Sequence, residues 1–424
     1  MPTRGASGLW LAALGVGLLL SGVSVAHADE TCLECHRTQR VARLRAPAEQ
    51  LPESVHGRHN VTCSNCHGGR PDEPSARAHD VTAGFQARFA AGSQPTVCGN
   101  CHADARRMNV EDPGLPTNQL QLYATSVHGR AFAAGNTRAA TCATCHGAHD
   151  VRAVSDPESR VSPRNVAETC GHCHSDRPLM TSLGMPHDEE RQWRHSVHGR
   201  AYTRWIERTG SSALARAERH PPTCNDCHAD HAVASRDAAV AGCMRCHGDM
   251  WQSFSDGPHK QAFQRMGFLP CVDCHGSHEV SPSDASLIGV ERDAACRRCH
   301  SEGQRMFATI RQLGVEVGAA ERAADNARAS LAGEPIGALE TKLRPIDEAR
   351  HALRIAIHSL DKDEIGRAAA LLKTRAERVT RPASPPSAVV AVVANWGPPT
   401  ALLVVGLVFL FLAFRRQRGG KSEL

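Results

Sequence analysis

The sequence predicts a mainly α-helical protein with extensive irregular loops, a C-terminal helical hairpin and one transmembrane helix. Three features of the 424-residue chain support this prediction. Eighteen cysteines lie in close pairs before residue 300, and only 4% of the residues are aromatic. A cysteine-free segment rich in Ala, Arg, Glu and Leu then leads to an apolar C-terminus. So few aromatic side chains provide little apolar volume for a conventional hydrophobic core.

All eighteen cysteines belong to nine copies of the pattern Cys-x-x-Cys-His. In this pattern the two thiols attach a haem and the adjacent imidazole binds its iron. Zinc ribbons and dithiol redox sites also use Cys-x-x-Cys pairs, but neither requires a histidine after every second cysteine. We therefore predict nine covalently attached c-type haems, packed at about thirty residues per haem. The haems would supply the missing apolar volume of a multihaem cytochrome c fold that requires its cofactor to fold.

The predicted ligands of these haems follow directly from the motifs. The attachment cysteines are Cys32, Cys35, Cys63, Cys66, Cys98, Cys101, Cys142, Cys145, Cys170, Cys173, Cys224, Cys227, Cys243, Cys246, Cys271, Cys274, Cys296 and Cys299. The proximal iron ligands are His36, His67, His102, His146, His174, His228, His247, His275 and His300. Nine haems bring about eighteen propionate charges, which change the formal +5 of the chain to about −13 and argue against nucleic-acid binding.

Two apolar ends predict the cellular compartment. Residues 1–28 have the basic start, apolar stretch and small-residue cleavage site of a secretory signal peptide, cleaved near Ala28; an uncleaved anchor is the alternative. Residues 389–414 are almost entirely apolar and follow a Pro-rich linker at 381–388. The basic tail at 415–424 suits the cytoplasmic side of a membrane. We predict one C-terminal anchor in the cytoplasmic membrane and a periplasmic location for most of the chain.

An internal repeat supplies candidates for the second axial ligand of each iron. Ser-Val-His-Gly occurs at 54–57, 126–129 and 196–199, with a diverged copy around His259. Each copy precedes one haem motif, a histidine followed two residues later by valine, and a second haem motif. The units run at about 54–110, 126–180, 196–250 and 258–301, within a predicted cytochrome domain at 29–301. The predicted distal ligands are His56, His79, His128, His149, His198, His231, His259 and His278.

The spacing of the second distal candidate indicates which haem it serves. His149, His231 and His278 each follow a proximal histidine by three residues. Such neighbours on one helical face cannot bind the same iron from opposite sides, so each is expected to reach an adjacent haem. In the first unit the spacing is wider, and His59 competes with His79 for this role.

The first motif precedes the repeat and has no distal histidine inside it. Residues 302–380 are predicted to supply the ninth distal ligand. This segment has helical apolar stripes, a break at residues 333–335 and a third helix beginning at Asp361. The region around His358 resembles the helical segment that donates a distal ligand in the multihaem nitrite reductase superfamily, although the asparagine and proline of that segment are missing. We predict His358 as the ninth distal ligand. The alternatives are a methionine or one of His351, His187, His195 and His59.

The repeated Ser-Val-His-Gly and Cys-x-x-Cys-His units resemble those of periplasmic multihaem cytochromes c related to the class III cytochromes. The resemblance implies electron transfer through low-potential bis-histidine haems. We predict a membrane-anchored relay in anaerobic respiration between a quinol-linked membrane partner and periplasmic redox proteins. It is expected to have no small-molecule substrate and no catalytic residue. The alternatives are a reductase of nitrite, hydroxylamine or a sulfur oxyanion with one open haem, and a permanent subunit of a larger respiratory complex.

Overall fold

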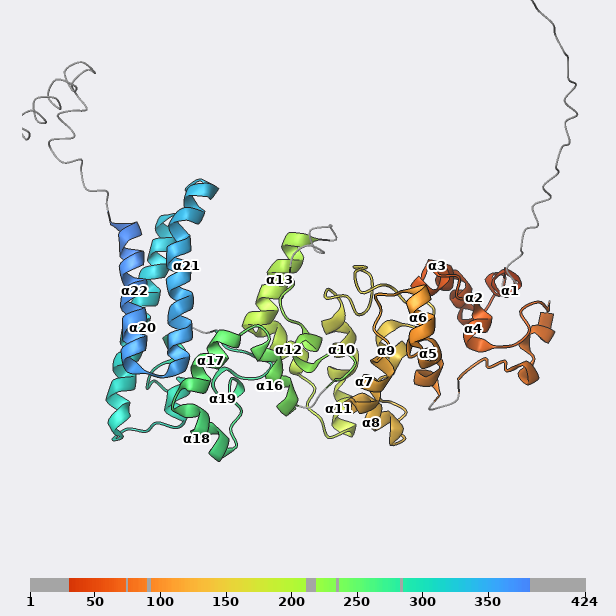
Figure 1. The fold of residues 1–424 in the computed structure, drawn as a ribbon, viewed down its shortest axis with the longest axis horizontal. Helices are drawn as coiled ribbons and strands as arrows, with labels where there is room; N and C mark the ends of the chain where they lie inside the picture. The colour runs from red at the N-terminus through yellow and green to blue at the C-terminus, as the bar shows by residue number, and fades with distance from the viewer. Residues whose placement is uncertain are drawn as a thin grey trace, which may run out of the picture. The chain divides into compact units, whose positions relative to one another are not determined.

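Helices joined by irregular loops make up the whole of the described chain (Figure 1). The computed structural model describes residues 30–73, 75–89, 93–210, 219–233, 236–282 and 285–381, and within these ranges there is no strand. This confirms the mainly α prediction. The chain divides into two compact units. Unit 1 comprises the described residues up to Cys243 together with His278–Val280, and unit 2 comprises Met244–Ser277 and the described residues from Ser281 onward.

The helices of unit 1 are short, as expected for a chain that folds around bulky cofactors. They are α1 (Glu30–Arg37), α2 (Ala42–Gln50), α3 (Val55–Arg58), α4 (Cys63–His67), α5 (Gln94–His102), α6 (Ala105–Glu111), α7 (Gln119–Thr125), α8 (Val127–Ala133), α9 (Cys142–His146), α10 (Val166–His174), α11 (Arg177–Ser182), α12 (Glu189–His195), α13 (Val197–Thr209), α15 (Cys224–His228) and α16 (Arg236–Met244), with 3₁₀ turns η1 (Leu51–Glu53), η2 (Ser75–His79) and η3 (Val81–Ala83). The buried apolar cluster of this unit is small and consists of Ala167, Trp193, Tyr202 and Trp205.

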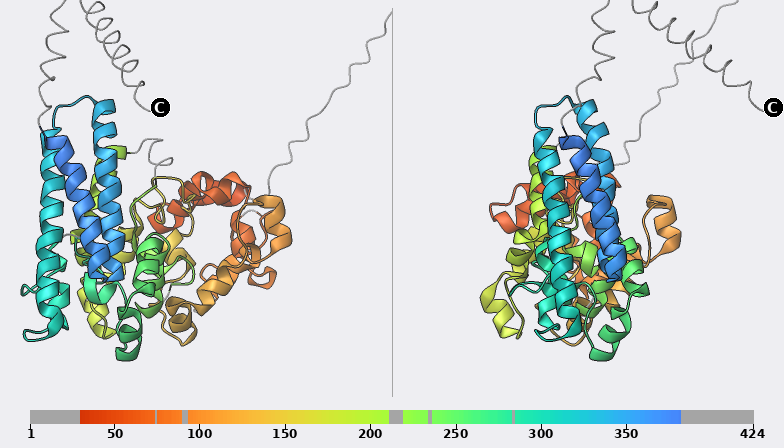
Figure 2. Two further views of the ribbon diagram at one scale, coloured as in Figure 1. Left: turned by 60° about the vertical axis from the view of Figure 1, so that its left-hand side comes forward. Right: turned by 90° about the vertical axis from the view of Figure 1, so that its left-hand side faces the viewer.

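Unit 2 combines short helices with three long ones. The short elements are α17 (Gly248–Asp256), α18 (His259–Met266), α19 (Val272–His275), η4 (Ala285–Leu287) and η5 (Ala295–Arg298). The long helices are α20 (Arg305–Ser330), α21 (Ile336–Ser359) and α22 (Lys362–Thr380), which lie side by side as a three-helix bundle (Figure 2). The third helix begins where the sequence predicted it, after Asp361, and it packs along both helices of the expected hairpin.

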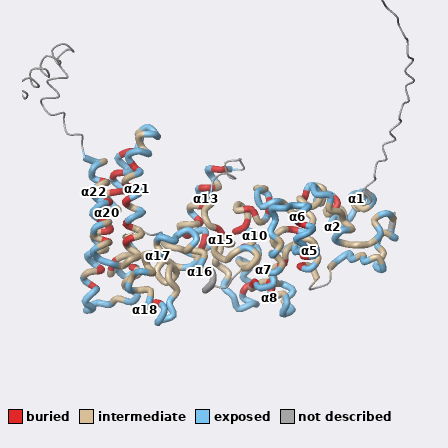
Figure 3. Tube along the Cα trace, in the orientation of Figure 1, coloured by how far each residue is buried: buried red, intermediate tan, exposed pale blue. Residues whose placement is uncertain are grey.

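The bundle has a conventional side-chain core. Ala324, Ala327, Leu353, Leu372 and Ala376 are completely buried, and the buried positions recur along the facing sides of the three helices (Figure 3). The alanines allow the helices to approach closely, and the leucines fill the space between them. The Asp361 side chain caps α22 by accepting the backbone N–H groups of Asp363 and Glu364, at the predicted helix start.

Both predicted membrane-associated segments, residues 1–28 and 389–414, lie outside the described residues, as does almost all of the linker at 381–388. Among the residues that are described, no helix is long and apolar enough to cross a membrane. The predicted domain boundaries remain predictions.

The Ser-Val-His-Gly repeat is explained by local helix geometry. Its serine is the N-cap of the following helix: in the third copy the Ser196 hydroxyl accepts the Gly199 N–H at 3.0 Å and donates to the Trp193 carbonyl at 2.6 Å. A Cβ on Gly199 would lie 2.1 Å from that same carbonyl oxygen, so only glycine fits. The first two copies have the same cap and the same tight glycine. The histidine between them is thus fixed at the start of a helix.

Replacing Ser196 with alanine should lower stability by about 1–2 kcal/mol, because the helix loses its cap and two buried polar groups lose a partner. Thermal unfolding of the haem-loaded protein measures this as a lower midpoint. A Ser155→Ala variant is the matched control, since Ser155 is exposed in a turn. Equal midpoints for the two variants would contradict the capping role.

Candidate haem sites

Short helices position the Cys-x-x-Cys-His motifs. In α4, α9 and α15 the motif is itself the helix, and a threonine (Thr62, Thr141 or Thr223) forms a capping box with the third helical residue. In α5 and α10 the motif occupies the last turn of a longer helix. The three-residue spacing brings both thiols to one face of the turn. All eighteen cysteines are free, so none is used in a disulfide.

The structure brings most of the predicted histidines together in facing pairs. Eight of the nine motif histidines have a second histidine ring whose centre lies 5.9–6.1 Å away. The pairs are His36–His79, His67–His149, His102–His56, His146–His231, His174–His128, His228–His278, His275–His358 and His300–His259. Two imidazoles that bind one metal from opposite sides, each through a bond of about 2 Å, have ring centres about 6 Å apart.

The pairing follows a simple register along the repeat. His56, His128 and His259 each face the second motif of their own repeat unit, as His56 faces His102. The histidine of each His-x-Val element faces a motif of the preceding unit, as His149 faces His67 instead of its close neighbour His146. The proximal His247 and the candidate His198 share a repeat unit but lie in different compact units of the structure, and their ligation remains a prediction from the sequence.

This register changes the sequence interpretation of the first motif. The repeat was expected to leave His36 without an internal partner, but His79 of the first unit faces it at 6.1 Å. His59, the competitor of His79, is not part of the pair. The missing partner falls instead at the other end of the repeat: His278, the last His-x-Val histidine, faces His228, and no further repeat unit follows to supply a partner for His275. There His358 on α21 faces His275 at 6.0 Å.

Backbone hydrogen bonds connect successive repeat units in the same register. The N–H of Val55, in the first Ser-Val-His-Gly copy, donates to the carbonyl of Val151, two residues after His149. Val127 and Val197 donate in the same way to Val233 and Val280. Each bond is 2.9–3.1 Å long and ties one distal candidate to the next. The sequence analysis noted these valines only as markers of the repeat, because backbone pairing leaves little compositional signal.

The Nδ1 atoms of several paired histidines are held by oxygen acceptors. His36 lies 3.0 Å from the Leu44 carbonyl, His67 2.7 Å from the Gln86 carbonyl and His358 2.6 Å from the Arg354 carbonyl. An Nδ1–H that donates to a carbonyl leaves Nε2 unprotonated and fixes the ring orientation, as in most histidine-ligated metal sites. Sequence spacing did not reveal these acceptors.

Burial lowers the pKa of several of the paired imidazoles and so favours their neutral form. Desolvation, reinforced by the neighbouring rings of His358 and His247, lowers the pKa of His275 to about 4. Burial also lowers the pKa of His146 and His128, each of which faces another imidazole. A neutral imidazole is the form that binds iron, so these rings are prepared for ligation near neutral pH.

The motif cysteines show which haem sites are neighbours. The Cys98 thiol hydrogen-bonds to the Cys142 thiol of the next motif, which raises its pKa. Cys170 and Cys224 form the same contact between the following two motifs. Burial is the main cause that raises the pKa of Cys145 to about 11, and Coulombic repulsion from Cys170 of the next motif is the second cause. Haems attached at these thiols would lie next to one another in chain order.

Buried polar atoms without partners fit the presence of a bulky cofactor. Trp205 is 2% exposed and its Nε1–H has no acceptor, although the aromatic cluster to which it belongs packs against Cys224. Nδ1 of His259 is likewise buried without a partner. Orphaned buried donors are rare in folded proteins. A haem attached beside them would bring carboxylate acceptors, so the residues present fit the group that the motifs predict.

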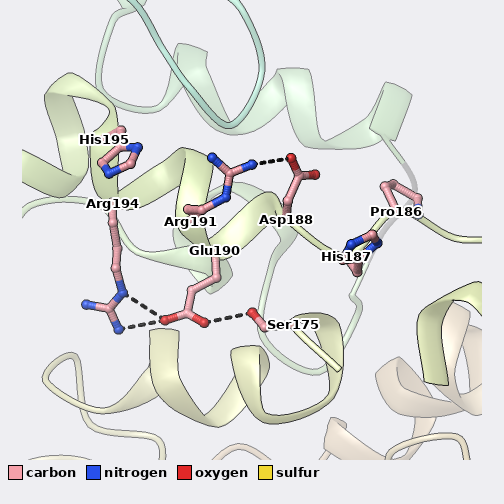
Figure 4. Close-up of a pocket in the computed structure, with 8 residues that line it drawn as sticks. All are labelled: Ser175, Pro186, His187, Asp188, Glu190, Arg191, Arg194 and His195. Carbon is pink, nitrogen blue, oxygen red and sulfur yellow. Dashed lines mark hydrogen bonds and ion pairs between the residues drawn. The ribbon is translucent and has the colours of Figure 1, made fainter. Parts of the chain in front are cut away.

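One polar hollow of about 640 Å³ adjoins the motif that ends at His174 (Figure 4). Its charged side chains are already paired: Arg191 with Asp188 at 2.8 Å and Arg194 with Glu190 at 2.6 Å. The Ser175 hydroxyl also donates to Glu190. His174 is itself faced by His128, so the hollow does not adjoin a motif histidine that lacks a facing ring.

The remaining candidates for the ninth distal ligand are not paired in this way. His187 and His195 line the hollow from opposite ends (Figure 4). His351 is 57% exposed on α21 and lies 4.0 Å from Asp249.

The helical fold and the paired histidines beside Cys-x-x-Cys-His motifs define a class of protein: this chain is a multihaem c-type cytochrome. The Cytochrome c3 family profile matches residues 218–301. Over 272 residues, 52% of this chain, it is 24% identical to the multiheme cytochrome MtrA of Shewanella baltica, of which 77% is covered. Over 157 residues, 35% of this chain, it is 28% identical to the cytochrome c-type protein NrfB of Escherichia coli, of which 66% is covered. No solved structure matches the chain.

Proposed function

We propose that this protein is a membrane-anchored electron relay that faces the periplasm and carries nine bis-histidine haems. The observation that carries the proposal is the set of facing histidine pairs, which supply both axial ligands at eight motifs. The relationship to two other c-type cytochromes supports it. His198 remains a proposed distal ligand on the strength of its place in the Ser-Val-His-Gly repeat.

The residues of the chain determine what the haems can do. Each haem, when bound, supplies one-electron chemistry at its iron. The two histidines of each pair would hold the iron and leave no position for a substrate, and histidine in place of methionine would favour a low potential. Cys98 lies beside Cys142 and Cys170 beside Cys224, so the haems attached at these cysteines would be neighbours. Such an arrangement moves electrons without a reaction chamber.

The partners and location of the relay follow from the two ends of the sequence. A secretory signal at 1–28 and an anchor at 389–414 would hold the haem region on the periplasmic side of the cytoplasmic membrane. There the protein would connect a quinol-linked membrane partner with periplasmic redox proteins in anaerobic respiration.

A reductase is the competing function, and it requires one iron with an open position. The relay predicts that the oxidised protein shows only low-spin haem in its electron paramagnetic resonance spectrum and that excess cyanide leaves its visible spectrum unchanged. Dithionite should reduce all nine haems. A high-spin signal from one haem in nine, or rapid cyanide binding, would favour the reductase and contradict the relay.

A further inference from the structure

A cluster of arginines follows the first haem motif. Arg37, Arg40, Arg43 and Arg45 lie within nine residues, and no acidic residue occurs between His36 and Ala48. Arg37, Arg40 and Arg43 are exposed, and the structure records no ion pair for any of them with another described residue. Three cationic side chains are therefore presented to solvent close to one haem site.

The fold holds these side chains beside the haem-ligating histidine. The Leu44 carbonyl of α2 lies 3.0 Å from Nδ1 of His36 at the end of α1. Arg45 strengthens the α1–α2 turn by donating to the Gln39 carbonyl at 3.3 Å and pairing with Glu49 at 3.2 Å. Arg43 precedes Leu44, and Arg37 follows His36 directly. The charged surface is thus fixed by contacts to the site itself.

The centre of this surface is apolar. Val41 is 48% exposed and Leu44 is 39% exposed between the arginines. Cys35, the second attachment cysteine, lies two residues before Arg37, so the haem attached there would adjoin this surface. A small apolar centre with a charged rim is typical of transient protein docking surfaces. We call Arg37, Arg40, Val41, Arg43 and Leu44 the arginine patch.

We infer that the arginine patch docks an acidic one-electron redox protein, which exchanges an electron with the haem at His36. The inference rests on the proposed relay function. In the exchange one electron passes between the iron of this haem and the cofactor of the partner, so that one is oxidised and the other reduced by a single electron. The positive rim attracts carboxylates that surround the partner's cofactor, and the apolar centre allows close approach.

The test uses the full haem-loaded chain and a reduced [2Fe–2S] plant-type ferredoxin as an acidic low-potential donor. Stopped-flow absorbance gives the second-order rate of haem reduction as a function of ionic strength. For the wild type the rate should fall as salt rises. Replacing Arg37, Arg40 and Arg43 together with glutamine should slow the reaction about tenfold at low salt and flatten its salt dependence.

A matched control removes the same charge elsewhere. Arg344, Arg367 and Arg378 are exposed on the three-helix bundle, and their triple replacement with glutamine should leave the rate within about twofold. Reduction by the methyl viologen radical cation, a small cationic reductant of low potential, should not be slowed in the patch variant. If both triple variants lost the same fraction of the reduction rate, the effect would come from the net charge of the protein and the inference would be overturned.

Two other outcomes would also overturn it. If the patch variant loses one haem or its reduction potentials shift, the arginines pair with the propionates of the haem and not with the carboxylates of a partner protein. If the variant loses binding to phosphatidylglycerol vesicles while its ferredoxin rate is unchanged, the patch faces a lipid surface. Failure of the relay itself is distinguishable, because it would appear in the wild type as an open, cyanide-binding haem.

Discussion

Replacing His358 with alanine should convert one of the nine proposed haems from low-spin to high-spin. His358 is on α21 and faces His275 at 6.0 Å. Its removal opens one axial position, so the variant should bind cyanide at one haem per molecule. Loss of an imidazole ligand should raise the potential of that haem by on the order of 100 mV, since axial ligands set haem potentials over a wide range. Spectroscopy and a potentiometric titration measure both effects.

Two further variants make this test specific to ligation. His351→Ala removes a histidine from the same helix whose ring is exposed and is not paired with a motif histidine, and it should leave every haem low-spin. His358→Met should restore a low-spin haem at a potential above that of the wild type, because methionine is a weaker donor to iron. A fully low-spin His358→Ala variant would show that His358 is not a ligand. The bundle should remain folded in all three variants, since alanine and methionine both favour helix.

The sequence predicted the components of the haem region more completely than their connections. Nine identical motifs and the Ser-Val-His-Gly repeat identify the ligating residue types without any structure. Spacing alone also predicts that His149 serves a haem other than that of His146, because two residues on one helical face cannot bind one iron from opposite sides. The shift of the register by one site was missed. His79 reaches His36 through the turn at 75–83 and the loops around it, and loop paths of that kind have no periodic signal.

The bundle was predicted from a different kind of information. Its apolar residues recur every three or four positions, and this period survives in the buried set Val317, Ala320, Ala324 and Ala327. The start of the third helix at Asp361 was also predictable from its capping side chain. The sequence did not indicate that α22 packs along both α20 and α21, because three amphipathic helices can pair in more than one way.

The two kinds of core imply very different dependence on haem. If the chain is expressed without residues 1–28 in the cytoplasm, where haem is not attached, residues 30–300 should remain unfolded. Their buried apolar set is too small to offset the entropy of ordering about 270 residues, as in metal-dependent small domains. The bundle should still form, because Leu353 and Leu372 are fully buried by the three helices themselves.

Limited proteolysis followed by mass spectrometry measures this difference. The apo-protein should yield one resistant fragment close to residues 305–380, while the haem-loaded protein should resist cleavage throughout the described chain. Circular dichroism of the apo-protein should retain the helical signal of the bundle and lose most of the rest. Resistance across residues 30–300 without haem would contradict the view that the cofactors are the core of this region. The expected pattern, a folded bundle beside an unfolded haem region, has a consequence for His358. This residue would already be held on a folded helix before a haem is attached next to His275.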